Sequence, residues 1–174
     1  VSFFKTTHSI PDSVGIVVKT DKGSIVYTGD FKFDQTATNG YRTDLARLAE
    51  IGRDGVLALL SDSANAENPA ETVAEHRIFE FINDNFEYQQ GRIVVASVAS
   101  NIMRVQQVFD AAAKNNRKVV LTGHDAEEIV NTALSMDKLH LPTEDLLVSA
   151  DHLSRLEDDQ VVILETGRSG EPLK

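Results

Sequence analysis

The sequence contains no cysteine, and none of its apolar runs is long. Without cysteine the chain has neither disulfides nor thiolate ligands for a metal. Residues 56–60 form an apolar run the length of a strand, far below the roughly 20 residues of a membrane span. No charged leader precedes a long apolar stretch at the N-terminus. We therefore expect no secretory signal, no membrane partner and a cytoplasmic location.

Glycine and proline are also scarce, with ten and four residues among 174, and 41% of the residues are hydrophobic. This composition is typical of a folded globular chain with one domain or two partial ones. The sequence starts at Val1 and stops two residues after Pro172, so we expect an internal piece of a longer protein. No Gly-x-Gly-x-x-Gly motif follows a predicted strand, which argues against a dinucleotide cofactor.

Positive charge is in the minority, because 17 basic residues face 27 acidic ones and the net charge is −10. Residues 1–62 have seven basic and eight acidic side chains, whereas residues 63–174 have ten and nineteen. Such a chain cannot hold nucleic acid through a general basic surface, because that binding requires Lys and Arg to neutralise phosphates. Any nucleic acid must be bound locally, by metal ions, helix N-termini or a few placed arginines.

The first third of the sequence predicts strands. Residues 14–20 and 24–28 are rich in β-branched side chains, and the turn between them ends in Gly23, which tolerates a positive φ. We expect Thr43 to cap a short helix that ends at Gly52. Residues 56–60 are continuously apolar, which is typical of a strand covered on both faces.

The rest of the sequence alternates between strands and helices, which predicts an α/β fold with a parallel sheet flanked by helices. Ile102, Val105, Phe109 and Ala112 have the spacing of a core-facing helical stripe. We expect helices over residues 71–86, 100–114 and 126–135, and strands over residues 92–96, 118–121, 146–148 and 161–164. The change of pattern predicts a domain boundary near residues 62–70.

Two groups of polar residues stand at the ends of predicted strands. His8 and Asp30 have side chains suited to zinc or manganese, although their spacing alone favours a polar turn for His8 and a loop cap for Asp30. Ser100, Asn101 and Arg104 follow a strand and open a helix, where backbone N–H groups favour a phosphate. The alternative for this second group is a plain helix cap with a surface arginine.

The amino-acid sequences of four segments add to these patterns. The chain reads Thr-His-Ser-Ile-Pro-Asp-Ser at 7–13, Tyr-Thr-Gly-Asp-Phe-Lys-Phe-Asp-Gln at 27–35, Leu-Ser-Asp-Ser-Ala-Asn-Ala-Glu at 60–67 and Ala-Ser-Asn at 99–101, before Arg104. In this order the segments closely resemble the ribonuclease J family, nucleases with a metallo-β-lactamase fold and an inserted β-CASP domain. The resemblance implies that residues 1–62 form the C-terminal part of the first metallo-β-lactamase half, a β-hairpin region. Residues 63–174 would form an incomplete β-CASP domain.

The resemblance also implies roles for single residues. His8 falls on the family's third metal-binding motif, and Asp30 falls on the fourth, whose aspartate bridges two divalent ions, zinc or manganese. Asp62 falls on the acidic residue near the active centre where the β-CASP region begins, and there it would support catalysis. Ser100, Asn101 and Arg104 would lie along the path of the RNA. The implied parent is a 5′-to-3′ exonuclease and endonuclease that acts in RNA decay and in rRNA and other RNA processing.

The family's His-x-His-x-Asp-His cluster is absent from these 174 residues. We therefore expect this piece neither to bind two metal ions tightly nor to cut RNA by itself. Residues 165–168 resemble the second paralogue of Gram-positive bacteria more than they resemble the principal enzyme of the family. That second paralogue is generally the weaker nuclease. The implied partners are RNA and either further copies of the protein or a sister paralogue.

Two alternatives to a nuclease stay open. The parent could be a weakly active or inactive structural partner in an RNA-decay complex. It could also hydrolyse a small phosphoester or lactam-like molecule, although the resemblance to a β-CASP domain argues against this. We expect His124 to be a loop residue, and residues 167–172 resemble a glycine-rich segment of the family.

Overall fold

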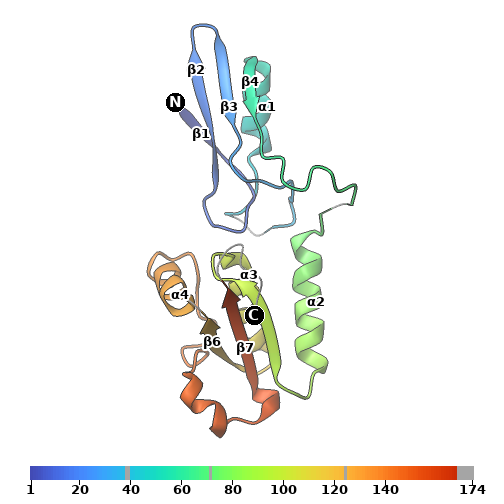
Figure 1. The fold of residues 1–174 in the computed structure, drawn as a ribbon, viewed down its shortest axis with the longest axis vertical. Helices are drawn as coiled ribbons and strands as arrows, with labels where there is room; N and C mark the ends of the chain where they lie inside the picture. The colour runs from blue at the N-terminus through green and yellow to red at the C-terminus, as the bar shows by residue number, and fades with distance from the viewer. Residues whose placement is uncertain (38–39, 71, 124, 168–174) are drawn as a thin grey trace. The chain divides into compact units, whose positions relative to one another are not determined.

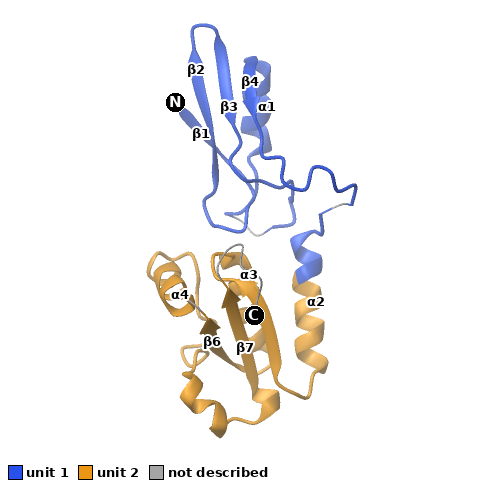
Figure 2. Cartoon of the chain, viewed as in Figure 1, with its two compact units in different colours: residues 1–78 blue, residues 79–174 orange. Residues whose placement is uncertain are grey.

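A computed structural model of the chain describes residues 1–37, 40–70, 72–123 and 125–167. It divides into two compact units, Val1–Ile78 and Phe79–Lys174 (Figure 2). Helix α2 (Glu75–Tyr88) crosses this division. The assignment of residues 1–62 and 63–174 to two named domains stays a prediction.

Unit 1 is built on a four-stranded sheet in the order β1-β2-β3-β4 (Figure 1). The first three strands run antiparallel, as the hairpin signal at Gly23 predicts, and this glycine has a φ of +134°. The fourth strand is parallel to β3. The strands are β1 (Ser2–Lys5), β2 (Val14–Thr20), β3 (Gly23–Tyr27) and β4 (Val56–Leu60).

Helix α1 (Leu45–Arg53) packs on this sheet. The prediction that Thr43 caps the helix is wrong, because the side chain of Asp44 accepts the N–H of Arg47 at 2.9 Å. Thr43 is instead buried, and its Oγ1 accepts a hydrogen bond from the backbone N–H of Thr7. The core of the unit consists of Phe4, Val17, Val26 and Ile51, with Leu48 packed against them.

Strand β4 is formed as predicted, but the prediction that both of its faces are covered is wrong for this structure. The Leu57 and Leu59 side chains are 61% and 63% exposed, and Leu60 is 52% exposed. Among the described residues β4 pairs with β3 alone and is an edge of the sheet. The apolar side chains of residues 56–60 are therefore not covered by any described part of the chain.

Unit 2 confirms the predicted α/β fold with a parallel sheet flanked by helices (Figure 1). Strand β7, the last in sequence, lies between β5 and β6 and runs parallel to both. The expected strand at 146–148 is reduced to a single bridge between Val119 and Leu147. The elements are β5 (Ile93–Val98), α3 (Ile102–Lys114), β6 (Lys118–Gly123), α4 (Ala126–Ser135), β7 (Val161–Gly167) and the short 3₁₀ helices Ala150–Arg155 and Asp158–Gln160.

Helix α3 shows why the periodicity in this half was informative. Its predicted stripe of Ile102, Val105, Phe109 and Ala112 is buried. Phe109 and Val105 are fully enclosed with the central residues of β6 and β7. The helix therefore has a fixed face toward the core, and this fixes the position of its N-terminus beside the end of β5.

Candidate functional site

His8 and Asp30 lie together in unit 1 although they are 22 positions apart in the sequence. The Nε2 atom of His8 is 3.6 Å from Oδ2 of Asp30. The His8 side chain is 31% exposed and that of Asp30 is 73% exposed, so both are accessible from solvent. An imidazole and a carboxylate that face one another in this way suit a shared cation or a direct ion pair.

Hydrogen bonds of the preceding residue, Thr7, fix the position of His8. Thr7 is fully buried, and its backbone N–H donates to Oγ1 of Thr43 at 2.9 Å. The carbonyl of Thr7 accepts the backbone N–H of Lys32, also at 2.9 Å. This bridge connects the segment after β1 to the segment after β3, and it places His8 and Asp30 side by side.

Asp62 reaches the same place from the neighbouring parallel strand. The backbone N–H of Thr28 donates to the carbonyl of Leu60, and the N–H of Asp62 donates to Oγ1 of Thr28, both at 3.0 Å. Oδ2 of Asp62 accepts from the N–H of Phe31 at 3.5 Å, and Oδ1 accepts from Ala64 at 2.8 Å. Asp62 therefore caps its own loop and also contacts the residue that follows Asp30.

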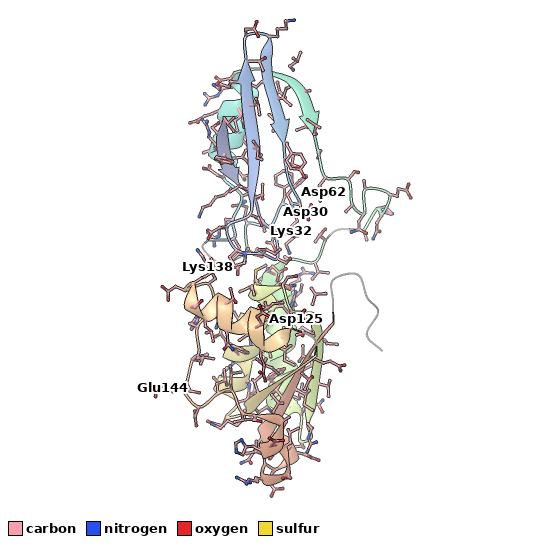
Figure 3. The ribbon with its side chains drawn as sticks, turned by 60° about the vertical axis from the view of Figure 1, so that its left-hand side comes forward. Asp30, Lys32, Asp62, Asp125, Lys138 and Glu144 are labelled. Carbon is pink, nitrogen blue, oxygen red and sulfur yellow. The ribbon has the colours of Figure 1, made fainter. Side chains whose placement is uncertain are left out.

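Figure 3 shows Asp30, Lys32 and Asp62 at the same end of the sheet in unit 1. Asp30 and Asp62 follow β3 and β4, two neighbouring parallel strands that end at one edge, and His8 pairs with Asp30. Imidazole nitrogen and carboxylate oxygen fit zinc or manganese as ligand types. Across the described ranges, no group of three or more His, Asp and Glu residues is placed to hold a metal ion. The metal assignments of His8 and Asp30 and the catalytic assignment of Asp62 stay predictions.

Ser100, Asn101 and Arg104 lie at the N-terminus of α3 in unit 2. Asn101 is the N-cap, and its side-chain oxygen accepts the backbone N–H of Arg104 at 3.1 Å. The carbonyl of Ser100 accepts the N–H of Ile102 at 2.9 Å. The cap uses the amide oxygen of Asn101 and leaves its amide nitrogen as a donor type suited to phosphate. An RNA-binding role for the three residues stays a prediction.

A charged cluster that the sequence did not predict lies close to Asp30 in the chain. Lys32, Asp34 and Glu75 meet in unit 1, and the side chains of Asp34 and Glu75 are only 5% and 8% exposed. Burial raises the pKa of Asp34. Hydrogen bonds from the Thr36 side chain and from backbone N–H groups, with the charge of Lys32, outweigh this effect and lower it to about 2. No sequence pattern indicated this cluster, because Asp34 and Glu75 are 41 positions apart.

Comparison with known proteins finds one family model and several relatives similar to this chain. Residues 90–174 match the family described as the β-CASP domain of ribonuclease J. The chain is 57% identical over 173 residues to ribonuclease J 2 of Streptococcus pyogenes, covering 99% of this chain. It is 45% identical to ribonuclease J 2 of Staphylococcus epidermidis and 44% identical to that of Staphylococcus aureus, covering the whole chain.

The chain spans 31% of the length of each of these relatives. A crystal structure of a protein of unknown function from Enterococcus faecalis has a TM-score of 0.66 at 14% identity. The match covers 94% of this chain and 40% of the Enterococcus faecalis chain, and it supports the fold alone. No helix within the described ranges has the length and apolar character to cross a membrane. The expectations for His124 and for residues 168–172 concern positions outside the described residues.

Proposed function

Because the chain belongs to the ribonuclease J family, we propose that it is part of a metal-dependent ribonuclease of RNA decay and processing. The full-length protein would act as a 5′-to-3′ exonuclease and as an endonuclease in the cytoplasm. The observation that supports this most is the pairing of His8 and Asp30, 3.6 Å apart, beside Asp62. These three residues match the family's motifs and are gathered by contacts over long sequence distances.

In this proposal His8 and Asp30 would hold divalent ions, zinc or manganese. Two such ions, when bound, activate a water molecule and neutralise the charge that develops on the phosphate. Asp62 would orient the segment of Asp30 through its contact with the N–H of Phe31. Ser100, Asn101 and Arg104 would bind the RNA backbone, and contacts of this kind do not read base sequence.

We further propose that this chain by itself is inactive and binds no metal ion tightly. His8 and Asp30 supply two ligands, whereas a zinc site with catalytic activity uses about three protein ligands and an open position. The exposed apolar side chains of β4 support the same proposal, since exposed patches of this kind often mark a surface that another part covers. Partners of the full-length protein would be RNA and further copies or a sister paralogue.

The test uses the full-length protein with manganese and an RNA that has a 5′-monophosphate and a 3′ label. A double variant, His8→Ala with Asp30→Ala, is compared with wild type and with a control of the same composition, His152→Ala with Asp21→Ala. Shortening of the RNA by wild type and control, and not by the first variant, supports the proposal. Equal inertness of all three, with RNA or the sister protein still bound, supports a structural partner instead.

A further inference from the structure

The side chain of Lys32 connects the segment after Asp30 to the start of helix α2. Its Nζ atom is 2.5 Å from Oε1 of Glu75 and 3.6 Å from Oδ2 of Asp34. The Lys32 side chain is 23% exposed, and both carboxylates are almost fully buried. Buried charges are costly unless they are paired, so these three side chains depend on one another.

The same segment satisfies the backbone of the first turn of α2. The N–H of Glu75 donates to Oδ2 of Asp34 at 2.7 Å, and the N–H of His76 lies 3.5 Å from Oγ1 of Thr36. The first N–H groups of a helix have no partner within the helix, and a carboxylate there is also favoured by the helix dipole. Asp34 and Thr36 therefore provide, from about 40 positions away, the cap of this helix.

Backbone hydrogen bonds connect Lys32 and the residue before it to the segments of His8 and Asp62. Its N–H donates to the carbonyl of Thr7, the residue before His8, at 2.9 Å. The preceding N–H, that of Phe31, points to the carboxylate of Asp62. The few residues that follow Asp30 are thus attached to the segment of His8, to the end of β4 and to α2.

We propose that Lys32, Asp34 and Glu75 are positioning residues, which hold residues 30–34 in place and thereby keep Asp30 facing His8. None of the three binds the metal ion in this proposal. The inference rests on the proposed function, because it assigns these residues to the site formed by His8 and Asp30. Removal of Lys32 takes away the cation that both buried carboxylates contact, so we expect residues 30–34 to shift toward water.

The first test measures hydrogen exchange of the metal-free, full-length protein. Lys32→Met and Glu75→Gln are compared with Lys32→Arg, which keeps the charge. The matched control is Lys19→Met, because the ion pair of Lys19 with Asp54, at 2.7 Å in the same unit, is exposed. We expect the amide of Lys32 to exchange about tenfold faster or more in Lys32→Met and Glu75→Gln. Lys32→Arg and Lys19→Met should retain the exchange rate of wild type. Equal exchange in Lys32→Met and Lys19→Met overturns the proposal.

The second test titrates the same variants with manganese ions. Lys32→Met should weaken binding about tenfold or more although both expected ligands remain, which is the usual effect of losing a residue that orients a ligand. Unchanged manganese affinity together with faster exchange overturns the link between the cluster and the site. Loss of binding in His8→Ala supports the proposed function separately. If His8→Ala binds as wild type does, the metal assignment fails, and the exchange result alone decides the positioning role. If Lys32→Met does not fold, Glu75→Gln against Lys19→Met decides the same comparisons.

Discussion

Thr7 and Thr43, which are 36 positions apart, hydrogen-bond to one another in both directions. The backbone N–H of Thr7 donates to Oγ1 of Thr43, and the N–H of Thr43 donates to Oγ1 of Thr7, each at 2.9 Å. The two hydroxyl oxygens are also 3.0 Å apart. Both residues are buried, so this pair satisfies backbone groups that water cannot reach. It anchors the residue that precedes His8.

Replacing Thr43 by valine should destabilise the protein. The change keeps the shape of the side chain and removes the acceptor of the Thr7 N–H, which stays buried. We expect a loss of about 1–3 kcal/mol in the free energy of unfolding, the cost of an unsatisfied buried group. Urea unfolding measures it. Thr6→Val is the matched control, since Oγ1 of Thr6 is buried and has no hydrogen-bond partner within the described part of the chain. Its stability should be unchanged or higher, and an equal loss in both variants would contradict the role of the pair.

Acid should weaken the fold through Asp34. Its pKa is about 2 in the folded protein, below its usual value of 3.8. A lowered pKa contributes stability that is fully present above about pH 4 and is lost as the pH falls toward 2. The contribution is about 2 kcal/mol. Unfolding free energies of wild type and Asp34→Asn, measured between pH 6 and pH 2, should converge as the pH falls. Parallel curves would show that another group is responsible.

Two glycines should respond in opposite directions to alanine. Gly123 has a φ of +105°, and a Cβ there would clash with the carbonyl oxygen of Thr166. Gly123→Ala should therefore cost at least about 2 kcal/mol, from the clash and the strained backbone. Gly52 lies in α1 with open space around it, and Gly52→Ala should stabilise the protein by up to about 1 kcal/mol. Thermal unfolding midpoints give the sign of both changes. A neutral Gly123→Ala would mean that β6 and β7 separate easily at this end.

Substitutions of Asn101 should separate its role as a helix cap from its proposed contact with RNA. Asn101→Ala removes the acceptor of the Arg104 N–H and should cost about 1 kcal/mol of stability. Asn101→Asp keeps the acceptor, so the unfolding free energy should return toward wild type. It also replaces an amide donor with a negative charge, so RNA affinity of the full-length protein should fall. RNA affinity equal to wild type in Asn101→Asp would reduce the residue to a cap.

Local patterns in the sequence were sufficient for most of the secondary structure. Strands β2 and β4 and helix α4 have the predicted bounds, since β-branched runs and helical periodicity are properties of neighbouring residues. The N-cap of α1 was misplaced by one residue. Threonine and aspartate are both good caps, and burial of Thr43 against Thr7 decided between them.

The motifs of the sequence by themselves determined the family and the candidate residues His8, Asp30 and Asp62. That these residues gather at one end of a sheet was decided by tertiary structure, through the bridge from Thr7 to Lys32. Tertiary structure also left β4 exposed and placed Asp34 at the start of α2. The contacts of Thr7 with Lys32 and of Asp34 with Glu75 join residues about 20 to 40 positions apart. They form because the folded chain must provide hydrogen-bond partners for buried polar groups. No local pattern contains that information.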